Sequence, residues 1–197
     1  MITKPIENLS SCGRTFLALY PPEEALQEML ELAQSFYRTS ADIKALRKVK
    51  EEQYHLTFRF FECLCEVERK AFCETIEAKL PVLKAPELAV AGIGGFPHIR
   101  KPRVIWLGLE PPSAARSLFA LTEEAAEEAG LGREERPLKP HITIARVNYV
   151  GKNDYETAAL KLKSAYPPRK WNLLQLMDSK LSSSGAVHSP IAVWKLK

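Results

Sequence analysis

The chain has 197 residues, of which 46% are hydrophobic and 26% are charged, and its net charge is +4. This length and composition predict a globular protein of one domain or two packed lobes. The mild positive excess favours anionic ligands but does not indicate a protein that coats nucleic acid. No apolar run reaches the roughly 18 residues of a membrane-spanning helix, and the first residues do not read as a secretion signal, so a cytoplasmic location is expected.

Hydrophobic periodicity and turn residues divide the chain into strands and amphipathic helices. In chain order, the sequence predicts a strand at 14–20, a helix at 26–37, a strand at 54–60, a helix at 67–76, strands at 88–93 and 103–109, a helix at 114–125, a strand at 141–147, a helix at 155–166, and strands at 172–178 and 190–196. Because several strands follow one another without an intervening helix, antiparallel pairing and the α+β class are favoured over a parallel sheet.

The four cysteines are Cys12, Cys63, Cys65 and Cys73. A chain with this much apolar material and no secretion signal does not need disulfides, so we expect reduced thiols. Their spacing lacks the paired C-x-x-C or H-x-x-x-H pattern that is typical of metal sites. The sequence therefore predicts neither a bound metal nor a cofactor.

One internal repeat stands out, because "HLTF" at 55–58 returns as "HITI" at 141–144. Each copy lies in a predicted strand between two predicted helices, which suggests two lobes related by a pseudo-twofold axis. Side chains alternate along a strand, so His141 and Thr143 share one face. In the first copy, one face is predicted to carry His55, Thr57 and Arg59, and the other Tyr54, Leu56, Phe58 and Phe60.

Two imidazoles and two hydroxyls that meet between the lobes suit a phosphate group. Hydroxyls donate hydrogen bonds to phosphoryl oxygens, and one imidazole can act as a base while the other acts as an acid near neutral pH. Displacement at phosphorus places the attacking and leaving oxygens on opposite sides, so one histidine from each lobe fits both proton transfers. A single H-x-T strand is more often a satisfied polar pair, but two matching copies favour a functional site.

With these motifs, the chain resembles the RNA 2',3'-cyclic phosphodiesterases, the two-histidine (2H) phosphoesterase family that is also named for a 2'-5' RNA ligase activity. The resemblance rests on both motifs and on "FLALYPPEE", "GIGGFPHIRKPRVIWLGLE", "RPLKPHITIARV" and "GAVHSPIAVWKL". It implies a single bilobal domain over residues 14–197, with two antiparallel-sheet lobes around a central cleft. Residues 1–13 are then an N-terminal extension without an assigned purpose.

The resemblance also implies a metal-independent opening of a ribose 2',3'-cyclic phosphate to a 2'-phosphate. By position, His55 is the general acid for the leaving 3'-oxygen and His141 the general base for water, although these two roles can be exchanged. Thr57 and Thr143 are expected to hold the phosphate oxygens. Arg146 matches the arginine of the family's H-x-T-x-x-R pattern.

Phe60 occupies the offset after His55 that Arg146 occupies after His141, and this offset of five is a physical difficulty. Strict alternation sends both side chains to the face opposite the histidines. For Arg146 we favour a bend or bulge that returns it to the site, because a guanidinium would stabilise the charged transition state. For Phe60, a core position and a platform for stacking a base are both open.

Other candidates are basic or aromatic residues near the motifs. Arg100 and Arg103 in a basic loop, and Lys139 two residues before His141, are candidate RNA contacts. His98 and His188 are expected to be surface or packed residues without a role.

The expected partners are RNA ends or small 2',3'-cyclic nucleotides. No protein partner or membrane is indicated, and a monomer is expected. Two alternatives stay open: a 2'-5' RNA ligase that works in the cell, and a module that binds RNA ends or nucleotides without turnover.

Overall fold

The structure is a computed structural model that describes residues 12–149, 151–162, 166–182 and 185–197. The first eleven residues of the predicted N-terminal extension lie outside this part. In chain order the helices and strands are β1 (Gly13–Tyr20), α1 (Glu23–Thr39), β2 (Leu46–Lys48), β3 (Leu56–Leu64), α2 (Glu66–Lys79), β4 (Glu87–Phe96), β5 (Val104–Glu110), α3 (Arg116–Glu128), β6 (His141–Val147), α4 (Tyr155–Lys161), β7 (Arg169–Lys170), β8 (Leu173–Ser182) and β9 (Gly185–Lys195). The predicted α+β class is confirmed.

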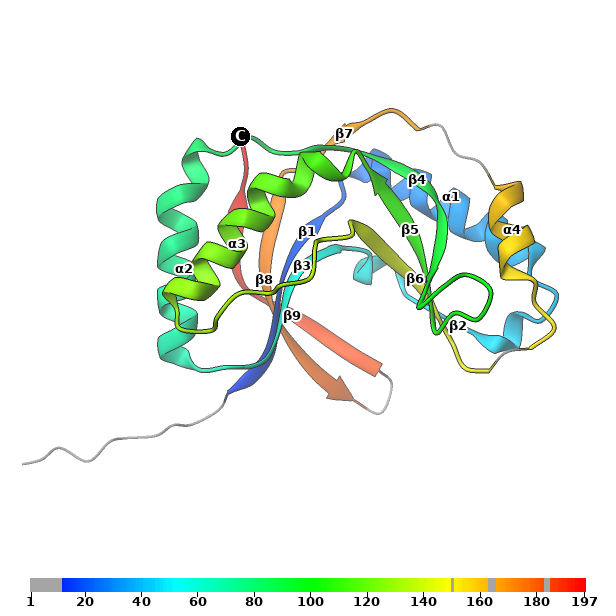
Figure 1. Cartoon of the computed structure of the whole chain (residues 1–197), viewed down its shortest axis with the longest axis horizontal. Coiled ribbons are helices and arrows are strands. Elements are labelled where there is room, and N and C mark those ends of the chain that lie inside the picture. Colours follow the sequence, from blue (N-terminus) through cyan, green and yellow to red (C-terminus); the bar gives the residue numbers. More distant parts are fainter. Residues whose placement is uncertain (1–11, 150, 163–165, 183–184) are drawn as a thin grey trace, which may run out of the picture.

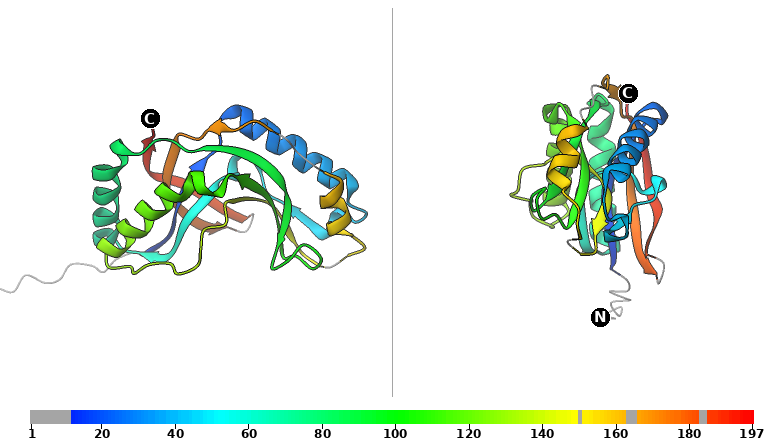
Figure 2. Two further views of the ribbon diagram at one scale, coloured as in Figure 1. Left: turned by 45° about the horizontal axis from the view of Figure 1, so that its top comes forward. Right: turned by 90° about the vertical axis from the view of Figure 1, so that its right-hand side faces the viewer.

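The strands of the described chain form one curled antiparallel sheet in the order β7-β4-β5-β6-β3-β1-β8-β9, and β2 pairs with β6 beside this path. The order is symmetric about β6 and β3, so the sheet has two halves. We call β3, β1, β8 and β9 the first half, and β6, β5, β4 and β7 the second half. The two predicted lobes are therefore halves of one continuous sheet, which bends into an arch (Figures 1 and 2).

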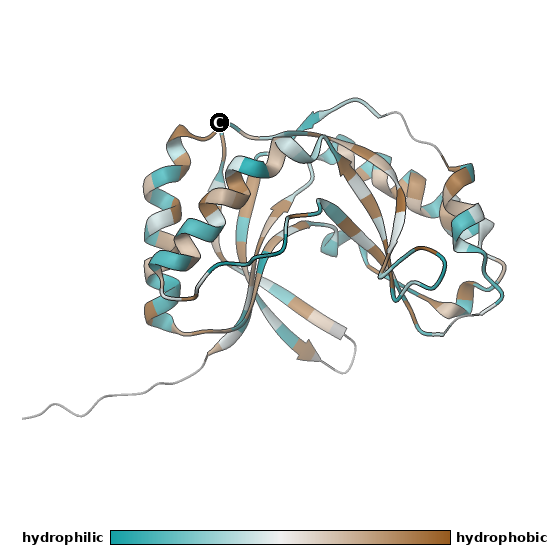
Figure 3. Ribbon diagram, viewed as in Figure 1, coloured by the Kyte–Doolittle hydropathy of each residue, from teal (hydrophilic) through white to brown (hydrophobic). Residues whose placement is uncertain are grey.

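Helices cover one face of each half. In the first half, α2 packs on α3 and α3 contacts β3; in the second half, α1 and α4 both contact β4. The helices alternate hydrophilic and hydrophobic residues, as expected for amphipathic helices with one buried stripe (Figure 3). The core lies between helices and sheet and includes the fully buried Leu17, Leu56, Leu107 and Ile142. We call the opposite face of the sheet the inner face.

Local sequence accounts for the start of one helix and the end of another. The backbone N–H of Cys65 donates a hydrogen bond to the Glu68 carboxylate at 2.8 Å, which forms a capping box at the start of α2. Gly130 ends α3 with a φ of +80°, a left-handed conformation that glycine adopts without strain. The last helix is shorter than predicted, because α4 ends at Lys161 rather than near Tyr166. None of the helices in the described ranges is long and apolar enough to cross a membrane.

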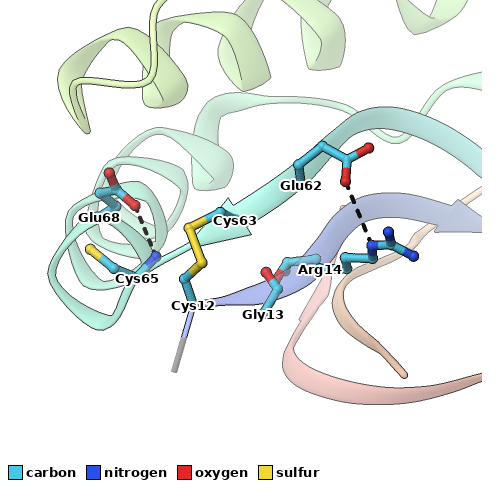
Figure 4. Close-up of a disulfide and its surroundings, with 8 residues drawn as sticks. Cys12, Gly13, Arg14, Glu62, Cys63, Cys65 and Glu68 are labelled. Atoms are coloured by element: carbon cyan, nitrogen blue, oxygen red, sulfur yellow. Dashed lines mark hydrogen bonds and ion pairs between the residues drawn. A yellow bond between two sulfur atoms is a disulfide. The ribbon is translucent and has the colours of Figure 1, made fainter. Parts of the chain in front are cut away.

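The prediction of four reduced thiols is wrong, because Cys12 and Cys63 form a disulfide (Figure 4). Cys12 immediately precedes β1 and Cys63 lies near the end of β3, and the two strands pair here with Gly13 opposite Leu64. Composition argued that a disulfide is not needed, but the strand pairing brings these two side chains together. Cys65 and Cys73 are free.

Denatured, unreduced protein should expose two reactive thiols, and reduction should raise that number to four. Because the disulfide closes a loop between residues 51 positions apart, Cys12→Ser should lower the free energy of unfolding by up to about 4 kcal/mol. Thiol titration and denaturant unfolding measure the two effects. Under reducing conditions the variant and the wild type should unfold alike. Four reactive thiols before reduction would show that the cross-link does not form.

Candidate active site on the inner face

The two His-x-Thr strands meet at one residue pair, with Leu56 of β3 opposite Ile142 of β6. Both side chains are fully buried in the core. One step to either side, antiparallel register places His55 next to Thr143 and Thr57 next to His141, on the inner face. The junction of the two halves therefore gathers all four predicted polar side chains on one face of two neighbouring strands.

A β-bulge follows the first motif. Leu17 of β1 lies opposite Arg59 and Ala18 lies opposite Thr57, so Phe58 is the extra residue. Beyond the bulge, Phe60 lies opposite Phe16, and opposed residues of an antiparallel pair share a face. Phe60 is therefore on the inner face, where 48% of its surface is exposed. The strict alternation that sends Phe60 to the core is wrong. Of the two roles left open for Phe60, the structure excludes a core position and leaves a platform for stacking a base.

The same bulge moves Arg59 to the face opposite its predicted one. Arg59 lies opposite the fully buried Leu17, and its guanidinium forms an ion pair with Glu123 of α3. The guanidinium also donates to the carbonyl of Gly132 at 3.2 Å. The prediction that Arg59 shares a face with His55 is therefore wrong, because the bulge reverses the alternation after Thr57.

A second bulge follows the second motif at the same offset. Thr143 lies opposite Trp106 and Ala145 lies opposite Ile105, so Ile144 is the extra residue. The carbonyl of Ile144 accepts a hydrogen bond from the Tyr37 hydroxyl and another from the backbone N–H of Val49, each at 2.8 Å.

Beyond this bulge, the second motif regains the inner face. Arg146 lies opposite Val104, two residues before Trp106 on β5. It therefore shares the inner face with His141 and Thr143, as the favoured bend requires.

The first half-site consists of His55, Thr57 and Phe60 with three ring neighbours. The His55 ring stacks on Phe16 at 4.7 Å between centroids, and Tyr20 lies 5.5 Å away. The third neighbour is His188 of β9, whose ring lies 6.1 Å from that of His55 at an angle of 89°.

The second half-site consists of His141, Thr143 and Arg146 beside an aromatic wall. Phe96 of β4 and Trp106 of β5 lie 4.9 Å and 6.0 Å from the His141 ring. The Lys139 ammonium lies 4.7 Å from the Trp106 ring centroid, which places this predicted RNA contact directly beside the site.

The position of the Trp106 ring requires a residue without a side chain on the neighbouring strand. A Cβ atom on Gly94 would come within 2.2 Å of the Trp106 ring. Gly94 lies opposite Trp106 in the β4–β5 pair, so a glycine at this position lets the indole lie across the strand.

The imidazoles of the two half-sites differ in hydrogen bonding. Nδ1 of His141 lies 2.7 Å from the carbonyl oxygen of Lys139. Since a carbonyl only accepts, Nδ1 carries the hydrogen, and Nε2 of the neutral ring has a free lone pair. Nδ1 of His55 is buried and has no partner within hydrogen-bonding geometry among the described residues, although the Gln53 carbonyl, at the same offset, lies near enough to raise its pKa. Nδ1 of His188 is likewise buried without a partner in the described chain.

Burial keeps these imidazoles neutral in the free protein. Burial, followed by the charge of the neighbouring His188, lowers the pKa of His55 to about 4. A positive charge on His141 also disfavours protonation of His55 and lowers the same pKa by a smaller amount. Burial also lowers the pKa of His141 and of His188.

The two predicted loop cations, Arg100 and Arg103, differ in the contacts that they make. The Arg100 guanidinium forms an ion pair with Glu156 of α4 at 2.9 Å, so it is already engaged. Arg103 is exposed and its carbonyl accepts a hydrogen bond from Val147 at 2.9 Å, which holds it beside the end of β6. Among the residues that the structure describes, no group of three or more His, Cys, Asp or Glu is placed to hold a metal ion.

A family model described as the 2'-5' RNA ligase superfamily matches residues 21–176 of this chain. The chain belongs to the 2'-5' RNA ligase superfamily. The superfamily match includes both His-x-Thr strands, and the family resemblance of the motifs is therefore confirmed.

Several proteins similar to this chain carry the name RNA 2',3'-cyclic phosphodiesterase. The one from Methanocaldococcus jannaschii is 26% identical over 92% of this chain and 99% of its own length. The one from Geobacillus stearothermophilus is 33% identical over 57% of this chain, and the match spans only 36% of that protein's length. The crystal structure of E. coli LigT complexed with 3'-AMP has the same fold, with a TM-score of 0.68, 21% identity, and coverage of 95% of this chain and 99% of that one.

His188 and Arg47 are two basic residues of the inner face that sequence reasoning missed, as it missed the aromatic neighbours of the histidines. The strand predicted at 190–196 began after His188, so the alternation was never applied to it, whereas β9 begins at Gly185. Arg47 lies on β2 directly opposite Arg146. The sequence feature that could have pointed to Arg47 is the segment 44–50, which contains four cations and no acidic residue.

The partly buried His55 should make stability depend on pH. Its pKa is about 4 in the folded protein and ordinarily 6.5, so the unfolded chain binds more protons between these values. The free energy of unfolding should therefore fall as pH drops from about 6.5 to about 4, by about 3 kcal/mol in all from this group. Denaturant unfolding across this range measures the slope. His55→Asn should flatten it and the exposed His98→Asn should not; equal slopes in all three proteins would contradict the assignment.

Removal of the imidazole at position 188 should raise the pKa of His55. A protonated His188 disfavours a second positive charge nearby, and His188→Phe keeps a ring in place without that charge. NMR titration of the imidazole Cε1–H signals measures the effect, with His98→Phe as the control. An unchanged His55 pKa in the His188→Phe protein would show that the two rings do not interact.

Proposed function

We propose that the protein is a metal-independent RNA 2',3'-cyclic phosphodiesterase that opens terminal 2',3'-cyclic phosphates to 2'-phosphates. The observation that carries this proposal is the junction of the two halves, where both His-x-Thr pairs share one face and both motifs continue through matching bulges. The names of the superfamily relatives support the same activity.

In the proposed reaction, His141 removes a proton from water through Nε2, and the resulting oxygen attacks phosphorus. The bond between phosphorus and the 3'-oxygen breaks on the opposite side, and protonated His55 gives its proton to that oxygen. The hydrogen bond from Nδ1 of His141 to the Lys139 carbonyl supports the base role, because it leaves Nε2 unprotonated. The products are a 2'-phosphate and a free 3'-hydroxyl.

The substrate itself supplies the charge that His55 needs. With a pKa of about 4, His55 is neutral in the free protein near pH 7. A bound phosphodiester places a negative charge beside the ring, which favours the protonated imidazole and opposes the effect of burial. We infer that substrate binding promotes protonation of His55, which can then act as the general acid.

The remaining residues bind and orient the substrate. Thr57 and Thr143 donate hydrogen bonds to phosphate oxygens, and the Arg146 guanidinium stabilises the charge of the pentavalent transition state. Phe60, exposed on the inner face, offers a flat surface on which a base stacks.

The test is turnover of a nucleoside 2',3'-cyclic phosphate in excess EDTA, with the product identified by phosphorus NMR. Wild type should yield the 2'-phosphate, and His55→Ala or His141→Ala should lose roughly 10²- to 10⁴-fold in kcat. His98→Ala is the matched control, and thermal melting verifies that each variant folds.

Three results would count against the proposal: inhibition by EDTA, a 3'-phosphate product, or full activity in both histidine variants. Binding of the cyclic nucleotide without any product would instead favour a non-catalytic module.

A further inference from the structure

Arg47 and Arg146 are cross-strand neighbours on the inner face. They lie directly opposite each other in the β2–β6 pair, and the second bulge turns Arg146, and with it Arg47, toward the face of His141. Like charges that are directly opposed on a sheet destabilise it. Neither side chain forms an ion pair with an acidic residue in the described part of the chain, and both are exposed. The pair thus has an unbalanced positive charge beside the site.

The position of β2 explains how Arg47 reaches this place. β3 pairs with β6 only at Leu56 and Ile142 and then diverges, and β2 occupies the same edge of β6 further along, at residues 145–147. From Thr143, two regular strand steps lead about 7 Å to Arg146, and Arg47 lies about 5 Å further across. Each of these two distances is comparable with the distance between successive phosphates in an extended nucleic-acid chain.

The other cations of the segment do not share this position. Lys48 follows Arg47 and lies on the opposite face, with its ammonium 4.4 Å from the Tyr37 ring centroid of α1. Lys44 precedes β2 and does not belong to the paired strand. Lys50 lies beyond the end of β2, at the start of the short 3₁₀ helix Glu51–Gln53. Arg47 is therefore the cation of this segment that joins the inner face, and its planar guanidinium suits bidentate contact with a phosphate.

We propose that Arg47 binds the phosphate that precedes the 2',3'-cyclic end, so that the site prefers the terminus of an RNA chain to a mononucleotide. The inference rests on the proposed function. With Arg146 at the reacting phosphate, the next phosphate along the chain is the one that links the terminal nucleotide to its 5' neighbour. A nucleoside 2',3'-cyclic phosphate lacks that group and gains nothing from Arg47.

The test compares kcat/KM for three substrates: a nucleoside 2',3'-cyclic phosphate, a dinucleotide with the same cyclic end, and that dinucleotide with an uncharged methylphosphonate linkage. In the wild type the charged linkage should raise kcat/KM about tenfold over the uncharged one. In Arg47→Gln this ratio should approach one. Arg47→Lys should retain part of the advantage because it keeps the charge and loses the planar fork, and Lys44→Gln is the matched control that leaves the ratio unchanged.

A binding measurement separates this proposal from the proposed function. Fluorescence anisotropy with a labelled dinucleotide that ends in a 2'-phosphate needs no turnover. Arg47→Gln should raise its Kd about tenfold and reduce the slope of log Kd against log salt by about 0.7. If no substrate is turned over but Arg47→Gln still weakens binding, the proposed function fails and the phosphate contact stands. A ratio and a Kd equal to those of the wild type would overturn the role of Arg47.

Discussion

The buried pair of Leu56 and Ile142 is the contact on which the arrangement of the site depends. Because it is the sole residue pair that joins β3 to β6 in the described sheet, it fixes the register of the two halves relative to each other. A slip of one residue would turn the histidines and threonines of one strand into the core. Two aliphatic side chains with no chemistry of their own therefore determine where the polar groups meet.

Much of this structure could be read from the sequence, since the seven predicted strands, the four helices and the repeated motif all rest on local patterns of polarity. The alternation of side chains placed His55, Thr57, His141 and Thr143 correctly, but it failed at Arg59 and Phe60. A bulge depends on the partner strand, so the letters of "HLTFRF" carry no sign of the extra residue at Phe58. The disulfide and the neighbours Arg47 and His188 likewise depend on pairing between strands that are distant in sequence.

The electrostatics of the inner face divide it into two zones. Around the histidines, aromatic rings and burial disfavour charge, and the pKa values of all three imidazoles there are lowered. Toward the end of β6 the face carries arginines that no acid in the described chain neutralises. An anionic ligand is thus attracted at one end of the face and changes the protonation of the groups at the other.

Two of the helices make the two halves of the sheet depend on each other, although the halves resemble each other in strand order. α1 follows β1 of the first half, yet it packs on β4 of the second, where its Glu28 forms an ion pair with Arg169 of β7 at 2.7 Å. α3 follows β5 of the second half and covers β3 of the first (Figure 1). Each half is thus covered in part by a helix that follows a strand of the other half. A fragment that ended before β4 would expose the apolar stripe of α1, so the repeat cannot be separated into two independently folding pieces.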